Sequence, residues 1–401
     1  MGQSSANQMR QWRGPALFSY GFRPFFLFGS LWAGLAMVGW ILALSGTLDL
    51  PSRLDPISWH VHAFLFGYLG AAIAGFLLTA VPNWTGRLPV VGGQLIGLFT
   101  LWLAGRAALL VSAKIPFVLA AAVDLAFPIL LGAFLLREIV TGKNWRNLPV
   151  FGLLALFTLA DLIFLVEVGR GDFAASGLGV RVGLGAALMM VALIGGRVIP
   201  SFTRNWLAKS GRDARPAPPM QRFDKITLLG SVLAMAWWIA APASPVAAYL
   251  LGLMGVLHLL RLGRWKGGLT LHEPLLLVLH VAYLCLPLGA LAVSVSILRP
   301  DVLASASALH MWTAGMVGGM TLAVMSRATL GHTGRELRAG RGTVAVYAAL
   351  FAATACRVWA GFVPAPVLYH LAGSFWIAAF LGFAGVYGPM LLFPKRPKLA
   401  G

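Results

Sequence analysis

The chain has 401 residues, of which 59% are hydrophobic and 11% charged, and its mean hydropathy is +0.82. Soluble domains contain roughly 45–50% apolar and about 25% charged residues, so this composition excludes a soluble globular protein. A net charge of +19 would suggest nucleic-acid binding in a soluble protein, but here the positions of the basic residues give a different explanation.

Apolar segments of membrane-spanning length follow one another along the chain, separated by short polar breaks. A helix needs about 20 apolar residues to cross the hydrocarbon core. The sequence therefore predicts an all-α polytopic membrane protein with about 12 transmembrane helices. Lys114 alone divides the third predicted helix from the fourth. The predicted spans are 22–45, 58–81, 91–112, 115–136, 147–166, 178–199, 224–241, 244–261, 270–297, 303–328, 341–362 and 366–392.

A single transmembrane domain is predicted to cover 22–392. Three segments outside its helices are predicted to lie on the cytoplasmic side. They are the N-terminal segment 1–21, the basic, proline-containing loop 201–223 and the tail 393–401. The N-terminal segment lacks a cleavable signal pattern, so the first helix is expected to act as an uncleaved anchor. The loop is expected to be a flexible connector that contacts anionic lipid.

The basic residues sort by side of the membrane. With the N-terminus in the cytoplasm, 24 of the 31 lysines and arginines fall in inner segments and five in outer loops, and Arg106 and Arg357 lie inside helices. The positive-inside rule then predicts a multi-pass protein of the bacterial inner membrane with both termini in the cytoplasm. The lipid bilayer explains the basic residues, and nucleic acid is not expected as a partner.

The second and tenth predicted helices align without a gap at an offset of 248 residues. The sixth helix is a weaker third copy, in which Gly185 matches a shared glycine and Val180 takes the place of the histidine. The matched pairs are His62 with His310, Gly67 with Gly315, and Gly70 with Gly318.

These offsets predict three four-helix repeats, about 22–136, 147–261 and 270–392, in a pseudo-threefold bundle. The competing plan is a transporter with two six-helix halves, which should show similarity near an offset of 200 residues, where none is visible.

Ionisable side chains inside a bilayer are costly, so each one is a functional hypothesis. His62 and His310 lie at matching depths, and two imidazoles that face one axis are what axial ligation of haem b requires. Arg106 and Arg357 coincide at a nearby offset of 251 and reach the same level. Haem propionates would give both arginines charge-assisted hydrogen bonds.

Each of these residues also has a purely structural interpretation. The histidines would be hydrogen-bonded core residues, and the arginines would extend to the interface or pair with backbone carbonyls, Asp124 or Asp161. Three further histidines are candidates for a second metal, copper being suited to imidazole ligands, or for porphyrin contacts: His60, His280 and His370. A capping or solvated role is expected for the histidines at or beyond cytoplasmic helix ends: His258, His272 and His332.

Several motifs are long enough to be specific. They are GFRPFF from Gly21, WHVH from Trp59, GFLLTAVPNWTG from Gly75, GRVIP from Gly196, LAVM from Leu322 and LGHTGR from Leu330. These motifs, spread over about residues 18–387, resemble the NnrS family of bacterial membrane proteins. The resemblance implies a protein that contains haem and copper and contributes to resistance to nitric oxide and nitrosative stress.

The chain departs from that family at one position, because members commonly carry Glu after the second His of the helix-2 motif, where this chain has Ala63. The predicted repeat plan is also similar to the catalytic subunit of haem–copper oxidases and nitric oxide reductases. Those enzymes carry copper-ligating histidines on helices 6 and 7, whereas this chain has no histidine between Gly86 and Leu257. A binuclear centre of that type is therefore not expected.

Three functions remain open from the sequence. The first is a haem b protein of the nitric oxide response that binds nitric oxide or another diatomic ligand, or passes electrons from a quinol or a donor protein. Ligation by both histidines suits electron transfer, whereas ligation by one leaves a position for gas. The second is a nitric oxide or quinol-linked oxidoreductase with a second metal. The third is a transporter or metal-handling permease without haem.

Overall fold

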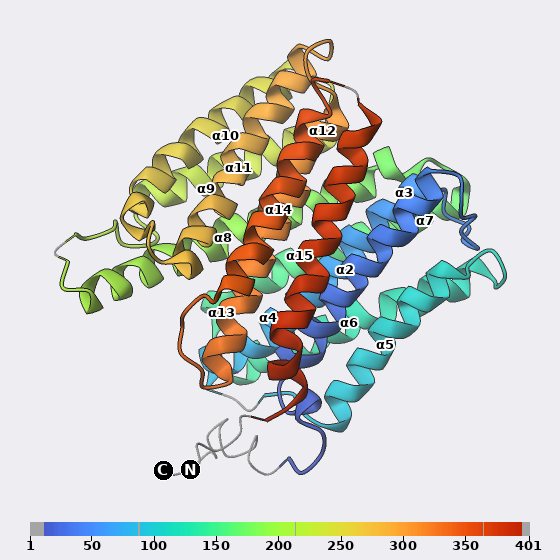
Figure 1. Cartoon of the computed structure of the whole chain (residues 1–401). Coiled ribbons are helices and arrows are strands. Elements are labelled where there is room, and N and C mark those ends of the chain that lie inside the picture. The colour runs from blue at the N-terminus through green and yellow to red at the C-terminus, as the bar shows by residue number, and fades with distance from the viewer. Residues whose placement is uncertain (1–11, 87–88, 213, 364, 395–401) are drawn as a thin grey trace. The chain divides into compact units, whose positions relative to one another are not determined.

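In a computed structural model, the described residues are 12–86, 89–212, 214–363 and 365–394, and they form helices joined by short turns (Figure 1). These residues contain no strand. Twelve helices are long and apolar enough to cross a membrane, so the predicted all-α polytopic fold is confirmed and the chain is a multi-pass membrane protein. The spans are Phe22–Leu44, Pro56–Thr85, Gly93–Leu110, Phe117–Thr141, Trp145–Arg170, Leu178–Lys209, Arg222–Ala240, Pro245–Gly263, Pro274–Leu298, Ser305–His332, Arg341–Trp359 and Pro366–Leu392.

The helix boundaries confirm one prediction and correct another. Helices α5 (Gly93–Leu110) and α6 (Phe117–Thr141) are separate, as the break at Lys114 predicted. Helix α8 (Leu178–Lys209), however, continues through residues 201–209, which were predicted to belong to a loop. Thr203 and Leu207 lie one turn apart on this extension, and both are buried. Their buried face stabilises about two helical turns beyond the end that hydropathy predicted for the helix.

The chain divides into two compact units. The first comprises residues 1–183, 325–337 and 380–401. Its main helices, besides α5 and α6, are α2 (Phe22–Leu44), α3 (Pro56–His62), α4 (Leu69–Thr85) and α7 (Leu148–Arg170). Helix α2 packs against α4, and α6 contacts α4, α5 and α7. Helix α6 therefore holds α4, α5 and α7 together in this unit.

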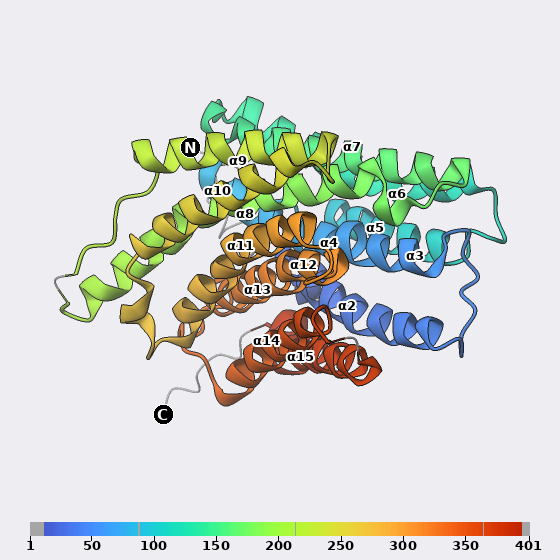
Figure 2. The ribbon, with the colours of Figure 1, turned by 90° about the horizontal axis from the view of Figure 1, so that it is seen from above.

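The second unit comprises residues 184–324 and 338–379. In it α10 contacts both α9 and α11, and the three run side by side (Figures 1 and 2). Its complete α-helices are α9 (Arg222–Ala240), α10 (Pro245–Gly263), α11 (Pro274–Leu298), α12 (Ser305–His310) and α14 (Arg341–Trp359). It also contains the larger part of α8 and parts of α13 (Gly319–His332) and α15 (Pro366–Leu392).

The second and tenth membrane spans share an irregularity. A π-helical segment, η2 (Ala63–Tyr68), directly follows His62, and another, η6 (Met311–Gly318), directly follows His310. Helix α8, the copy without the histidine, is α-helical throughout. π-Helical turns are rare and concentrate at functional sites. The shared irregularity supports the alignment of these two spans, while the pseudo-threefold arrangement stays a prediction.

Candidate functional site

His62 lies at the end of α3 in the first unit. Helix α3 begins at Asp55, whose carboxylate accepts hydrogen bonds from the backbone N–H groups of Ile57 and Ser58, and Pro56 fits the first helical position. The helix runs for seven residues to His62, which is 3% exposed. The cap fixes where the helix starts. The start in turn determines the face of the helix on which His62 lies, and that face is buried in the unit.

The imidazole of His62 faces two carboxylates from different helices. Its Nε2 lies 3.0 Å from Oδ1 of Asp161 on α7 and 3.2 Å from Oδ2 of Asp124 on α6. All three side chains are buried, and the rings of Phe66 and Phe164 lie beside the imidazole, with centroids 5.3 and 5.4 Å away. A buried polar group is costly unless it is paired, so these three residues form one interdependent cluster.

Arg106 on α5 completes this cluster through an ion pair between its Nη2 and Oδ1 of Asp124. The structural interpretation of Arg106, pairing with Asp124, is thus confirmed. Two glycines leave space for the two side chains of this ion pair. A Cβ on Gly67 would lie 2.6 Å from Nη1 of Arg106, and a Cβ on Gly105 would lie 2.7 Å from Oδ1 of Asp124. The shared glycine of the repeat therefore has a local purpose here, which is to admit the guanidinium.

Several polar groups of the cluster remain without a hydrogen bond among the described residues. They are Oδ2 of Asp124 and both Nε and Nη1 of Arg106, all buried. Pro128, one turn after Asp124 in α6, also lacks the N–H that would bond to the backbone carbonyl of Asp124. The two carboxylates outnumber the single guanidinium, so with a neutral imidazole the cluster has a formal charge of −1.

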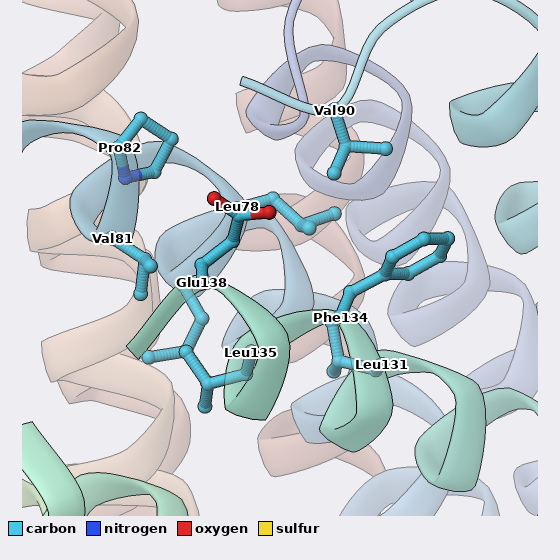
Figure 3. Close-up of a pocket in the computed structure, with 9 residues that line it drawn as sticks. Leu78, Val81, Pro82, Val90, Leu131, Phe134, Leu135 and Glu138 are labelled. Atoms are coloured by element: carbon cyan, nitrogen blue, oxygen red, sulfur yellow. The ribbon is translucent and has the colours of Figure 1, made fainter. Parts of the chain in front are cut away.

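Two crevices lie along α6 in this unit. Arg106 and Asp161 line one of them together with apolar residues. The other lies nearer the C-terminal end of α6, where the carboxylate of Glu138 lies among Leu78, Val81 and Leu135 (Figure 3). Leu131 lines both. The first crevice gives the buried cluster a small, mainly apolar space beside it.

In the second unit, His310 has different neighbours. Its Nδ1 lies 2.6 Å from the backbone oxygen of Ala306, one turn earlier. Arg357 on α14 donates from Nη1 to the hydroxyl of Ser307, at 2.6 Å, and its guanidinium lies over the ring of Tyr369. Arg357 thus lies near the helical turn that carries His310, and its role beside a haem propionate stays a prediction. The pairing of His62 with His310, which belong to different units, stays a prediction.

The three histidines considered for a second metal have separate surroundings. His60 stacks on Trp40, with ring centroids 4.5 Å apart. Nε2 of His280 lies 2.9 Å from the hydroxyl of Thr203, and His370 is exposed on α15. Within the described residues, the group of three metal-binding side chains that comes together is His62, Asp124 and Asp161. A copper site at His60, His280 and His370 stays a prediction.

His258 differs from its expected solvated or capping role. It is fully buried in the second unit, with Nδ1 2.8 Å from the hydroxyl of Tyr283 and Nε2 2.9 Å from that of Ser231. Arg261, one turn later, is also fully buried, and it donates to Asp224 and Tyr283. The prediction of a solvated end was wrong because hydropathy places a residue along the membrane normal and does not show which helix face it occupies.

The sequence signal for the His62 cluster was the rarity of carboxylates inside predicted spans. Asp124 and Asp161 were considered only as partners of arginines, since their approach to His62 depends on how α6 and α7 pack around α3. One imidazole nitrogen and two carboxylate oxygens can share a proton or hold a metal ion.

Comparison with known proteins gives the family. The family profile described as NnrS protein matches residues 16–395, nearly the whole chain. No curated protein matches the chain. The chain therefore belongs to the NnrS family.

Proposed function

We propose that this chain is a haem b protein of the bacterial inner membrane that binds nitric oxide during nitrosative stress. Membership of the NnrS family links it to the nitric oxide response in general. The inner-membrane location, with both termini in the cytoplasm, is supported by the excess of basic residues in the inner segments. A quinol or an electron-donor protein is the proposed source of electrons.

The observation that carries the proposal is the hydrogen bond of His310. Because a backbone carbonyl only accepts, the contact with Ala306 means that Nδ1 of His310 carries the hydrogen. The lone pair then lies on Nε2, the nitrogen that binds iron. Metal-ligating histidines usually donate their other N–H to a carbonyl or carboxylate in this way. His310 therefore has the protonation pattern of an iron ligand.

Arg357 suits the same site. Its guanidinium lies near the first turn of α12 and donates to a neutral hydroxyl, so a propionate would be a stronger acceptor than its present partner. Haem iron supplies reversible binding of a diatomic gas and a one-electron couple. In the proposal His310 would hold the iron, and Arg357 would bind a propionate.

His62 is a poorer match to an iron porphyrin. Its Nε2 faces two carboxylates, which accept hydrogen bonds, so without a metal this nitrogen carries a hydrogen and has no lone pair to offer. If His310 alone held the iron, the haem would keep a site for nitric oxide. The contacts of His62 therefore favour gas binding over bis-histidine electron transfer in this proposal.

The test compares optical spectra of the purified protein with those of His310→Ala and His62→Ala. We expect the Soret band to disappear in His310→Ala and to remain in His62→Ala, with each variant eluting as a folded protein in size-exclusion chromatography. Nitric oxide added to the reduced wild type should shift the band. A folded His310→Ala variant that keeps its haem would refute the ligand assignment, and loss of haem from both variants would restore the bis-histidine proposal.

A nitric oxide or quinol-linked oxidoreductase is the second candidate, because the His62 cluster is a place for the second metal that such an enzyme needs. A transporter without haem is the third, and purified protein without a Soret band would favour it.

A further inference from the structure

The His62 cluster contains more acceptors than its donors satisfy. The single N–H on Nε2 of His62 can point at one oxygen only, and Oδ1 of Asp161 at 3.0 Å is the one within hydrogen-bond geometry. Oδ2 of Asp124 is buried, lies 3.2 Å from the same nitrogen and has no hydrogen bond among the described residues. The N–H of a neutral His62 therefore leaves one buried carboxylate oxygen without a hydrogen bond, which is costly.

A metal ion would satisfy all three groups at once. Two ligand atoms at right angles on bonds of about 2.1 Å lie about 3.0 Å apart. Nε2 of His62 has that relation to one oxygen of each aspartate, at 3.0 and 3.2 Å, and the ligand atoms of all three residues lie within 4.8 Å of one another. The formal charge of −1 with a neutral imidazole also calls for a cation.

We propose that His62, Asp124 and Asp161 hold a divalent first-row transition-metal ion, with iron(II) as the expected occupant. Imidazole ligands suit iron, copper and zinc, whereas carboxylates favour the harder ions, and a set with two oxygens and one nitrogen matches iron(II) or manganese(II) better than copper. Arg106 is a positioning residue, because its ion pair holds Asp124 with Oδ2 directed at the imidazole.

The coordination positions of the proposed metal ion that the three side chains do not fill would face a crevice in this unit. Asp161 and Arg106 line this narrow crevice, whose other walls are apolar residues of α4, α6, α7 and the π-helical segment η2. The buried N–H groups of Arg106 are donors beside it. This proposal does not use His310 and stands apart from the haem proposal.

The test separates haem iron from other metal. Metal analysis of the purified protein, corrected for haem by the pyridine haemochrome assay, should give about one equivalent of non-haem metal per chain. Asp161→Asn should lose it, because the amide still accepts the hydrogen bond of His62 but ligates weakly. Chelator-treated protein is then titrated with manganese(II), and binding is measured by electron paramagnetic resonance. The variant should bind manganese(II) at least about 10–100-fold more weakly than the wild type, which is the range that changes around metal ligands produce.

Glu138→Gln is the matched control, since Glu138 is a buried carboxylate on the same helix as Asp124. It should keep the non-haem metal, and so should His310→Ala, which loses only haem if the proposed function holds. Wild-type protein without non-haem metal and without manganese(II) binding would overturn the site, as would equal binding by a folded Asp161→Asn variant. Elution in size-exclusion chromatography shows that the variants are folded, and His62→Gln gives a second ligand-removal variant if Asp161→Asn does not fold.

Discussion

His62 and His310 occupy matching positions in two aligned helices, each directly before a π-helical segment, yet their neighbours differ in kind. In the first unit the histidine and the following arginine meet at buried carboxylates. In the second unit the histidine bonds to a backbone carbonyl and the arginine to a hydroxyl. The offset of 251 that aligns the arginines places Phe375 at the position of Asp124.

This difference shows what an internal repeat preserves. The aligned helices keep the position of the histidine, the irregular turn after it and a glycine at the point of close approach. The charges around the histidine are set by residues on other helices, and those residues are not copied. The first site is therefore suited to a cation or a proton. The haem proposed for the second site would bring a porphyrin that balances the charge of its iron.

The largest effect on stability is expected from Arg106→Met. This change leaves Asp124 buried without its cation, and removing one partner of a buried ion pair typically costs about 3–5 kcal/mol. The matching change Arg357→Met removes a half-buried hydrogen bond from a charged donor and should cost at most about 1.5–3 kcal/mol. Thermal unfolding of the purified proteins in detergent measures both.

The double variant Arg106→Met with Asp124→Asn is the control for this prediction. Because it removes both charges, it should recover most of the stability lost by Arg106→Met alone. If the double variant is as unstable as the sum of the two single variants, the ion pair is not the source of the loss, and the contrast between the two units does not rest on charge.

How far the sequence could predict these sites follows from the same residues. The twelve spans, the break at Lys114 and the equivalence of His62 with His310 depend on hydropathy and local identity, which a single sequence contains. The approach of Asp161 to His62 depends on the packing of α7 against other helices, because residues 99 positions apart have no shared local pattern. The burial of His258 was missed for a similar reason, since its position near a helix end suggested contact with water.

A smaller effect is expected from Gly67→Ala. The new Cβ would lie 2.6 Å from Nη1 of Arg106 and 3.0 Å from Nε1 of Trp32, and overpacking of this kind typically costs about 1–3 kcal/mol. The equivalent change, Gly315→Ala, meets Sγ of Cys285 at 2.9 Å instead. We therefore expect Arg106→Met to reduce the cost of Gly67→Ala and to leave that of Gly315→Ala unchanged.

Thermal unfolding of the three single and two double variants tests this coupling. Equal coupling of Arg106→Met to both glycine variants would mean that the first glycine does not act by admitting the guanidinium, and the two aligned glycines would then have the same role.

The smallest effect is expected at an exposed ion pair in the turn before α12. Arg299 donates two hydrogen bonds to Asp301, and both side chains are more than 60% exposed. The bonds from Arg299 lower the pKa of Asp301 below its usual value. Any stabilisation from this pair is therefore present above the usual pKa of about 3.9 and lost as the pH falls through the lowered value in the folded state.

Since solvent screens exposed pairs, Asp301→Asn should leave the unfolding temperature at pH 7 unchanged within error. A marked drop at pH 7 would mean that exposure does not weaken ion pairs in this protein, and the large effect predicted for Arg106→Met could then not be assigned to burial.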